Sequence, residues 1–146
     1  MGLVYANIQL VNFADETLHE EGYLSSDAIR NVSVRAMADS GAIRLAINEN
    51  VRKQLGLRVR SKMPATLADG TVKILDIAGP IKVKFRDRDC ITDAFVLPDN
   101  EEVLLGAVPM ELMDLVVIPK IQSLEFNPAN PDGPKYSLRG VLKKAV

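Results

Sequence analysis

Short strand-like runs separated by tight-turn residues constrain this chain more than any other feature. Such runs occupy 4–11, 32–38, 63–68, 71–77, 81–85, 90–97, 103–105, 116–118 and 123–126. Several of them alternate apolar and polar residues, which is the period of a strand with one buried face. Asp69-Gly70 joins two runs and is a strong hairpin signal, in which we expect both residues to have positive φ. Eight or more short strands predict an all-β barrel or sandwich.

Two short helices are predicted between the strands. Asn48 can cap a helix that carries Val51 and Leu55 on one face, and Gly56 suits the position just past its end. Pro109 can open a second helix that runs to residue 115. The polar segment 15–27 is predicted to be a connection with one helical turn at 18–21.

The C-terminal composition marks a boundary. From Asn127 the sequence becomes rich in Pro, Asn, Gly and Asp. We predict one folded unit over 1–128 and a tail over 129–146 that is either mobile or a short docking helix. The residues at helical spacing in this tail are Leu138, Val141, Leu142 and Ala145.

Composition excludes several classes of function. The formal charge is only −1 over 146 residues, so no general attraction to nucleic acid or to a membrane surface is implied. No apolar run approaches the roughly 18 residues that a membrane span requires, and the N-terminus does not resemble a secretory signal. The single cysteine, Cys90, fits a reducing compartment. We therefore expect a cytoplasmic protein.

The stretch Asp39-Ser40-Gly41-Ala42 is the main candidate for chemistry. It follows the run at 32–38 and places a carboxylate on a tight turn beside the core. An Asp-Ser-Gly tripeptide alone is also typical of an ordinary turn, in which the Asp side chain bonds nearby amides. The stretch occurs once, so a site that needs two carboxylates would need two copies of the chain.

Other catalytic arrangements are less well supported. Cys90 opens an apolar strand and His19 lies among acids, which favours a buried inert thiol and an exposed histidine over a reactive pair. Ser40 lacks a nucleophile-elbow pattern. The alternating acids at 87, 89 and 93 are neutralised by arginines at 86 and 88, which indicates a solvated turn. We expect no metal and no cofactor, and we interpret the basic tail as a solvated terminus.

The order of motifs is more specific than any single one. A strand enters Asp-Ser-Gly-Ala, a helix ends at Leu55-Gly56, Asp69-Gly70 follows in a hairpin, and Leu104-Leu105-Gly106 precedes a second helix. Over roughly 1–128 this order resembles the retropepsin-like aspartic proteases (clan AA), in particular their small bacterial single-domain members. The resemblance implies a retropepsin-like barrel that is active as a two-fold homodimer.

The resemblance also assigns roles to residues. Asp39 would be the catalytic aspartate of each chain, Ser40 would bond across the dimer to the partner loop, and Gly41 would let water and substrate approach the backbone. Gly106 would pack under the active-site loop, where a side chain would collide. The hairpin at 64–74 would be the flap that closes over substrate.

The implied activity is that of an aspartic endopeptidase acting on extended peptide segments. Two nearby carboxylates share one proton, so together they supply the base that activates water and the acid that protonates the departing amine. The substrate would add as a strand between flap and floor. The residues predicted to bind it are Ala42, Ile43, Leu67, Ala68, Asp69, Gly70, Thr71, Leu104 and Leu105.

Some positions depart from the family pattern. Ile43 and Ala107 replace an acid and an arginine that often pair in retroviral relatives, Ala38 is smaller than usual, and Arg44 is unexpected beside the site. Two alternatives to a protease therefore stay open. One is a catalytically silent dimeric module of the same fold that binds peptides or acts as a scaffold. The other is a small β-barrel partner protein of a different family.

Overall fold

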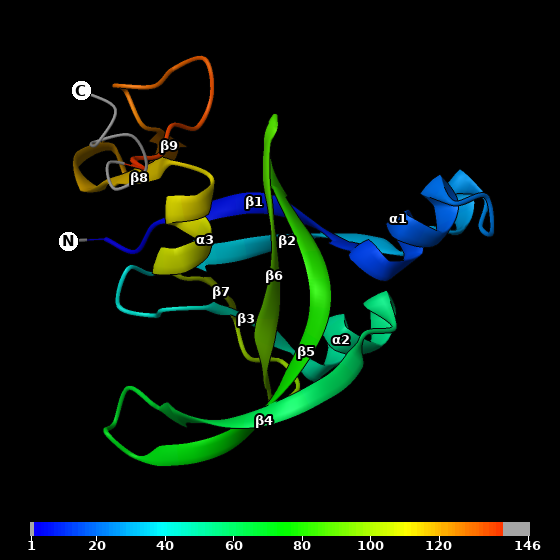
Figure 1. The fold of residues 1–146 in the computed structure, drawn as a ribbon. Coiled ribbons are helices and arrows are strands. Elements are labelled where there is room, and N and C mark those ends of the chain that lie inside the picture. The colour runs from blue at the N-terminus through cyan, green and yellow to red at the C-terminus, as the bar shows by residue number, and fades with distance from the viewer. Residues whose placement is uncertain (1, 139–146) are drawn as a thin grey trace.

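Six strands close into a barrel. The computed structural model describes residues 2–138, in which the ring runs β1-β2-β7-β3-β6-β5 and closes because β1 also pairs with β5 (Figure 1). The all-β barrel or sandwich predicted from the sequence is a mostly-β barrel that also carries three short helices. The ring strands are β1 (Tyr5–Asn12), β2 (Asn31–Ala38), β3 (Leu45–Asn48), β5 (Val72–Phe85), β6 (Arg88–Leu97) and β7 (Val103–Leu105).

One further strand lies outside the ring. Strand β4 (Arg58–Thr66) pairs only with the first part of β5, and the two form a long hairpin that extends away from the barrel (Figure 1). Nearly every residue of β4 is exposed. This hairpin contains the segment predicted to be the flap.

Two parallel pairings position the candidate site. Strand β2 runs parallel to β7, with Ala38 opposite Leu105, while β3 runs parallel to β6. Parallel neighbours end at the same edge of a sheet. The residues that follow β2 and β7, Asp39 and Gly106, are therefore brought together although they are far apart in the sequence.

The barrel interior is filled by aliphatic side chains from all ring strands. Leu10, Ile47, Ile81 and Leu105 are completely buried, and Leu55 of helix α2 (Glu49–Leu55) joins them. Burial of this kind contributes about 1.5–3 kcal/mol per large aliphatic side chain relative to its exposed state. The core therefore supports the strand ends that carry the site.

The helix predicted after β3 is confirmed together with its ends. The Asn48 side chain accepts a hydrogen bond from the amide of Val51 at 2.9 Å, and Gly56 follows with φ of 63°. The second predicted helix is α3 (Ala107–Leu112), which begins two residues before Pro109 because Gly106 is its N-cap, and ends before residue 115. Both helices lie on chain segments that leave the barrel directly after a short strand.

A third helix was not predicted. Helix α1 (Phe13–Glu20) occupies the first part of the segment expected to be a connection with a single helical turn, and the Asn12 side chain caps it through the amide of Asp15 at 3.0 Å. Short 3₁₀ turns follow at η1 (Ser26–Ala28) and, later in the chain, at η2 (Pro119–Ile121).

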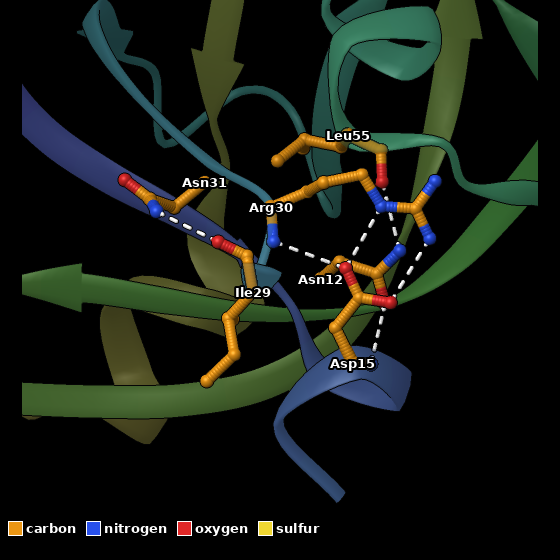
Figure 2. Close-up of polar contacts among 6 residues, drawn as sticks. All are labelled: Asn12, Asp15, Ile29, Arg30, Asn31 and Leu55. Carbon is orange, nitrogen blue, oxygen red and sulfur yellow. Dashed lines mark hydrogen bonds and ion pairs between the residues drawn. The ribbon is translucent and has the colours of Figure 1, made fainter. Parts of the chain in front are cut away.

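A buried polar cluster connects α1, the start of β2 and the end of α2 (Figure 2). Asn12 donates to the Leu55 carbonyl at 2.8 Å, and Arg30 donates to both Asp15 carboxylate oxygens at 2.8 and 2.9 Å. The Arg30 hydrogen bonds lower the pKa of the Asp15 carboxyl group. Because the carboxylate side chain is only 7% exposed, this ion pair ties the helix to the barrel.

The chain after β7 returns to the barrel through a small two-stranded sheet. This sheet is formed by β8 (Leu115–Ile118) and β9 (Ser123–Phe126). The Asp114 carboxylate accepts hydrogen bonds from Asn127 at 3.0 Å and Asn130 at 2.6 Å, and from the amide of Lys135 at 3.3 Å. The start of the predicted tail therefore contacts the folded unit.

The remainder of the predicted tail lies largely beyond the part of the chain described. Val141, Leu142 and Ala145 of the predicted docking helix fall outside residues 2–138. Across residues 2–138, no helix combines the length and apolar character that crossing a bilayer requires.

Candidate active site

The loop of residues 39–44 is fixed at both ends by backbone hydrogen bonds. The amide of Asp39 donates to the Leu105 carbonyl at 2.9 Å, which continues the β2–β7 pairing by one residue. The amides of Ala107 and Val108 donate to the carbonyls of Ala42 and Ile43 at 2.7 and 2.9 Å. The first residues of α3 therefore fix the second half of the loop.

Gly106 is required by size. A Cβ atom at this position would lie 2.3 Å from the Arg44 carbonyl oxygen and 2.8 Å from the Ala42 carbonyl oxygen. Its φ of −84° is accessible to any residue, so the constraint is steric and not conformational. The predicted close packing of Gly106 beneath the loop is confirmed.

The Asp39 carboxylate is oriented by its own loop. One carboxylate oxygen accepts a hydrogen bond from the amide of Gly41 at 2.9 Å, and the side chain is partly exposed. A Cβ on Gly41 would stand 3.1 Å from that same oxygen, so a larger residue would crowd the carboxylate. Ser40 lies between the two and is exposed. The arrangement presents an acid, an exposed hydroxyl group and an open backbone at one turn.

A cleft of about 490 Å³ begins directly beside this loop. Its floor is the outer face of three ring strands, where Ala46 of β3 stands opposite both Phe95 of β6 and Leu104 of β7. The β4–β5 hairpin, which contains the predicted flap and is called the flap hairpin below, forms the facing wall with Met63 and Leu75, which are cross-strand partners. Loop, floor and flap thus enclose a mostly apolar groove next to a carboxylate.

The flap turn differs in detail from the prediction. Leu67 donates to the Thr71 carbonyl at 2.8 Å, and Gly70 donates to the Leu67 carbonyl at 2.9 Å. Of the two residues expected at positive φ, only Gly70 has it, at 86°. A single left-handed Gly is typical of the three-residue hairpin loop, which needs one such residue where a two-residue type I′ turn needs two.

The Asp69 side chain stabilises this turn. It accepts hydrogen bonds from the Thr71 hydroxyl group at 2.6 Å and from the Thr71 amide at 3.0 Å. These bonds lower the pKa of the Asp69 carboxyl group, and nearby Lys73 lowers it further. The flap therefore carries an ionised carboxylate at its tip.

The structure brings many of the predicted site residues together. Gly41, Ala42, Ile43, Leu67 and Leu104 line the cleft. Residues 68–71 form the flap tip and are not among the lining residues, and Leu105 is completely buried, which does not fit its predicted role as a cleft wall. Lining residues that sequence reasoning missed are Arg44, Ala46, Met63, Pro64, Ala65, Thr66, Leu75, Phe95 and Leu97.

A signal for some of the missed residues was present in the sequence. Phe95 and Leu97 alternate with the buried Ala94 and Val96, so they occupy the outer face of β6. The pairing of β6 with β3, which turns this face into the floor, is not readable from alternation alone.

Cys90 and His19 are not brought together. The Cys90 thiol is buried beside the Pro109 carbonyl, and burial raises its pKa to about 11. His19 lies on α1 with its Nδ1 2.8 Å from the Leu24 carbonyl oxygen and is half-buried, not exposed as expected. Among residues 2–138, no group of three or more His, Cys, Asp or Glu side chains is placed to hold a metal ion.

Comparison with known proteins agrees with this geometry. A model of the family described as aspartyl protease matches residues 28–108, which is more than half of the chain and includes both Asp39 and Gly106. The chain therefore belongs to the retropepsin-like aspartyl protease family.

The fold has a solved counterpart. The crystal structure of the retroviral protease-like domain of Ddi1 from Leishmania major is similar, with a TM-score of 0.54 and 17% sequence identity. The similarity covers 88% of this chain and 90% of that one. At this identity it demonstrates a shared fold. A search of curated proteins gave no match.

Proposed function

We propose that the protein is an aspartic endopeptidase that acts as a homodimer, with Asp39 of each chain in one shared active site. The observation that carries the proposal is the position of Asp39. Its loop is fixed by backbone bonds to residues 105–108, and its carboxylate, which does not itself line the cleft, is hydrogen-bonded to the amide of Gly41, which does.

The chemistry follows from pairing two such carboxylates. Close together they cannot both ionise easily, so one keeps its proton. The ionised group takes a proton from water as the water oxygen attacks the peptide carbonyl carbon, and the protonated group supplies an acid. Collapse of the tetrahedral intermediate breaks the C–N bond, and the departing nitrogen receives a proton.

A two-fold axis beside Asp39 explains the number of acids and the exposure of Ser40. Each chain contributes one Asp-Ser-Gly stretch, and an isologous dimer is the commonest way to double a surface feature. The exposed Ser40 hydroxyl group would then bond to the partner loop. The extended substrate would lie between the flap and the floor, hydrogen-bonded as an added strand. The buried, unpaired Cys90 fits a cytoplasmic setting.

The deciding experiment compares wild type with Asp39→Asn on a diverse peptide library between about pH 4 and 7, at matched dimer concentration. Cuts made by wild type and absent with the variant would support the aspartic protease. If neither protein cuts while both are folded and dimeric, the chain is a silent peptide-binding module of the same fold.

Dilution tests the shared site. Because each active site needs two chains, specific activity should fall as the protein is diluted below its dimer dissociation constant. Analytical ultracentrifugation at the same concentrations gives the dimer fraction, and activity should follow it. A specific activity that stays constant while the dimer dissociates would contradict the two-chain site.

The pH dependence tests the shared proton. Activity should be favoured at acidic pH, since one carboxyl group of the pair must keep its proton. A rate that climbs steadily above about pH 8 would exclude this mechanism.

A further inference from the structure

Arg44 places a positive charge inside an otherwise uncharged cleft. Its guanidinium carbon lies 5.9 Å from the centre of the Phe95 ring, and both residues line the cleft. The Arg44 carbonyl oxygen packs against Gly106, so the backbone from which the side chain extends is fixed. Every other lining residue is uncharged.

The guanidinium has no acidic partner within the described structure. Across residues 2–138, the ion pairs involve other side chains, and none places a carboxylate within 4.0 Å of Arg44. The side chain is nevertheless half-buried. A partly desolvated cation among apolar groups gains most from a partner that brings both a negative charge and hydrogen-bond acceptors.

We propose that Arg44 makes this enzyme select peptides that carry an aspartate or glutamate at the position lying over the floor beside Phe95. The proposal rests on the proposed peptide-binding function and names the substrate class of the same site. A carboxylate matches the planar guanidinium fork with two parallel hydrogen bonds, which an amide or a hydroxyl group does not reproduce. The Phe95 ring, 5.9 Å from the guanidinium carbon, attracts the cation and favours side-chain conformations that stay in the cleft.

The expected discrimination is about tenfold in kcat/KM between a Glu peptide and its Gln counterpart. This corresponds to about 1.4 kcal/mol, the lower end of what a charged hydrogen-bonded group contributes. Two other charges stand on the facing flap, Asp69 and Lys73, and they oppose each other in sign. The proposed Asp39 pair carries one negative charge at the cut itself, so Arg44 is the charge that a peptide side chain away from the cut meets in the cleft.

The first arm of the test scans one cleaved peptide. Each residue flanking the cut is replaced in turn by Glu, Gln and Lys, and kcat/KM is measured at about pH 6, where a Glu side chain is ionised. Because the proposed dimer contains two copies of the cleft, one position on each side of the cut should show the tenfold Glu preference, and this preference should shrink as salt is raised. Arg44→Gln should bring the Glu-to-Gln ratio close to one, and Arg44→Glu should transfer the preference to Lys.

A matched control separates local from general charge effects. Arg58 is exposed at the start of β4 and does not line the cleft. Arg58→Gln removes the same charge by the same chemical change, and the tenfold ratio should persist in this variant. Thermal unfolding of all three variants checks that they are folded.

The second arm does not depend on cleavage. Fluorescence anisotropy measures binding to Asp39→Asn of labelled short peptides with one fixed Glu, Gln or Lys and apolar residues elsewhere. Tighter binding of Glu peptides, lost in the double variant Asp39→Asn/Arg44→Gln, would support the inference. It would do so even if wild type cuts no peptide, because the absence of cleavage would reject only the protease proposal. Equal kcat/KM for Glu and Gln at every position, a preference that survives Arg44→Gln, or no binding of any peptide would overturn it.

Discussion

The loop of residues 39–44, which carries the candidate active site, and the predicted flap tip contain the same local motif in different surroundings. In each, an aspartate side chain accepts a hydrogen bond from the amide two residues later, Asp39 from Gly41 at 2.9 Å and Asp69 from Thr71 at 3.0 Å. The loop is also bonded to β7 and α3, whereas the flap turn bonds only within its own hairpin. The aspartate-to-amide hydrogen bond shapes both turns, but only the loop at 39–44 is also held by neighbouring elements, β7 and α3.

Burial sharpens this difference. Leu105, next to the loop, is completely buried, while Val72 and Ile74 of the flap are 63% and 64% exposed. Segments with few buried contacts open at low free-energy cost, which a covering flap needs in order to admit substrate. A substitution in the loop should therefore reduce stability and activity together, and one in the flap should act mainly on activity.

The largest effect is expected for Gly106→Ala. The new methyl group would overlap two backbone oxygens that cannot move without breaking the loop bonds, so we expect a loss of about 3 kcal/mol in the free energy of unfolding. Cleavage should be lost as well, because Asp39 shifts with its loop. Urea unfolding and peptide cleavage measure the two effects.

Gly133→Ala is the matched control for that substitution. Nothing lies within 4 Å of a Cβ at Gly133, and the residue does not have positive φ. The control should leave stability and cleavage near wild type. If Gly106→Ala behaves in the same way, the loop is not fixed as described.

The second-largest effect is expected at a third aspartate, Asp15, which does not line the cleft. Asp15→Asn removes the charge that Arg30 binds, which should cost about 1–2 kcal/mol once solvent screening on the exposed side of Arg30 is allowed for. Cleavage at pH 6 by the folded fraction should be unchanged. A stability equal to wild type at neutral pH would show that the ion pair contributes no net stability.

Asp15 also predicts a pH window. Its folded pKa is lowered, so its contribution is complete above the unfolded value near 3.9 and is lost as pH falls through the folded pKa. Wild type should therefore lose stability below about pH 4 more steeply than Asp15→Asn. Urea midpoints measured from about pH 6 down to 2 test the sign.

Most helices and strands could be predicted from the sequence, but the strands and side chains that each of them contacts in the fold could not. Alternation and capping residues predicted most strands, and Asn48 and Gly56 marked both ends of α2 because these effects act within one turn of chain. Only one turn of helix α1 was predicted: its Asn12 cap is as local as that of Asn48 and was missed, whereas the Asp15–Arg30 pair forms only once the chain folds back. The role of Arg44 was not predicted for the same reason, because Phe95 reaches it through strand pairing.

A smaller effect, seen in KM and in hydrogen exchange of the flap turn, is expected for Gly70→Ala. Nothing surrounds this position, but its φ of 86° strains any residue with a Cβ by about 1 kcal/mol. The strain falls on the flap turn, so KM should rise several-fold. Hydrogen exchange should become faster at the amides of Leu67 and Gly70 and stay unchanged at Asp39 and Ala107. Equal acceleration at all four amides would mean that flap and loop open as one unit.

The smallest effect, Asp69→Asn, bears on both the flap and Arg44. Asparagine keeps an oxygen that can accept the two Thr71 hydrogen bonds, so the turn and the overall stability should not change measurably. What disappears is a negative charge facing an incoming acidic peptide. At low salt, kcat/KM for Glu peptides should therefore rise about twofold while that for Gln peptides stays constant, because a screened surface charge contributes little. The same rise for both peptides would point to a looser flap in place of reduced repulsion, and Asp69→Ala, which also loses the turn bonds, supplies the reference for that case.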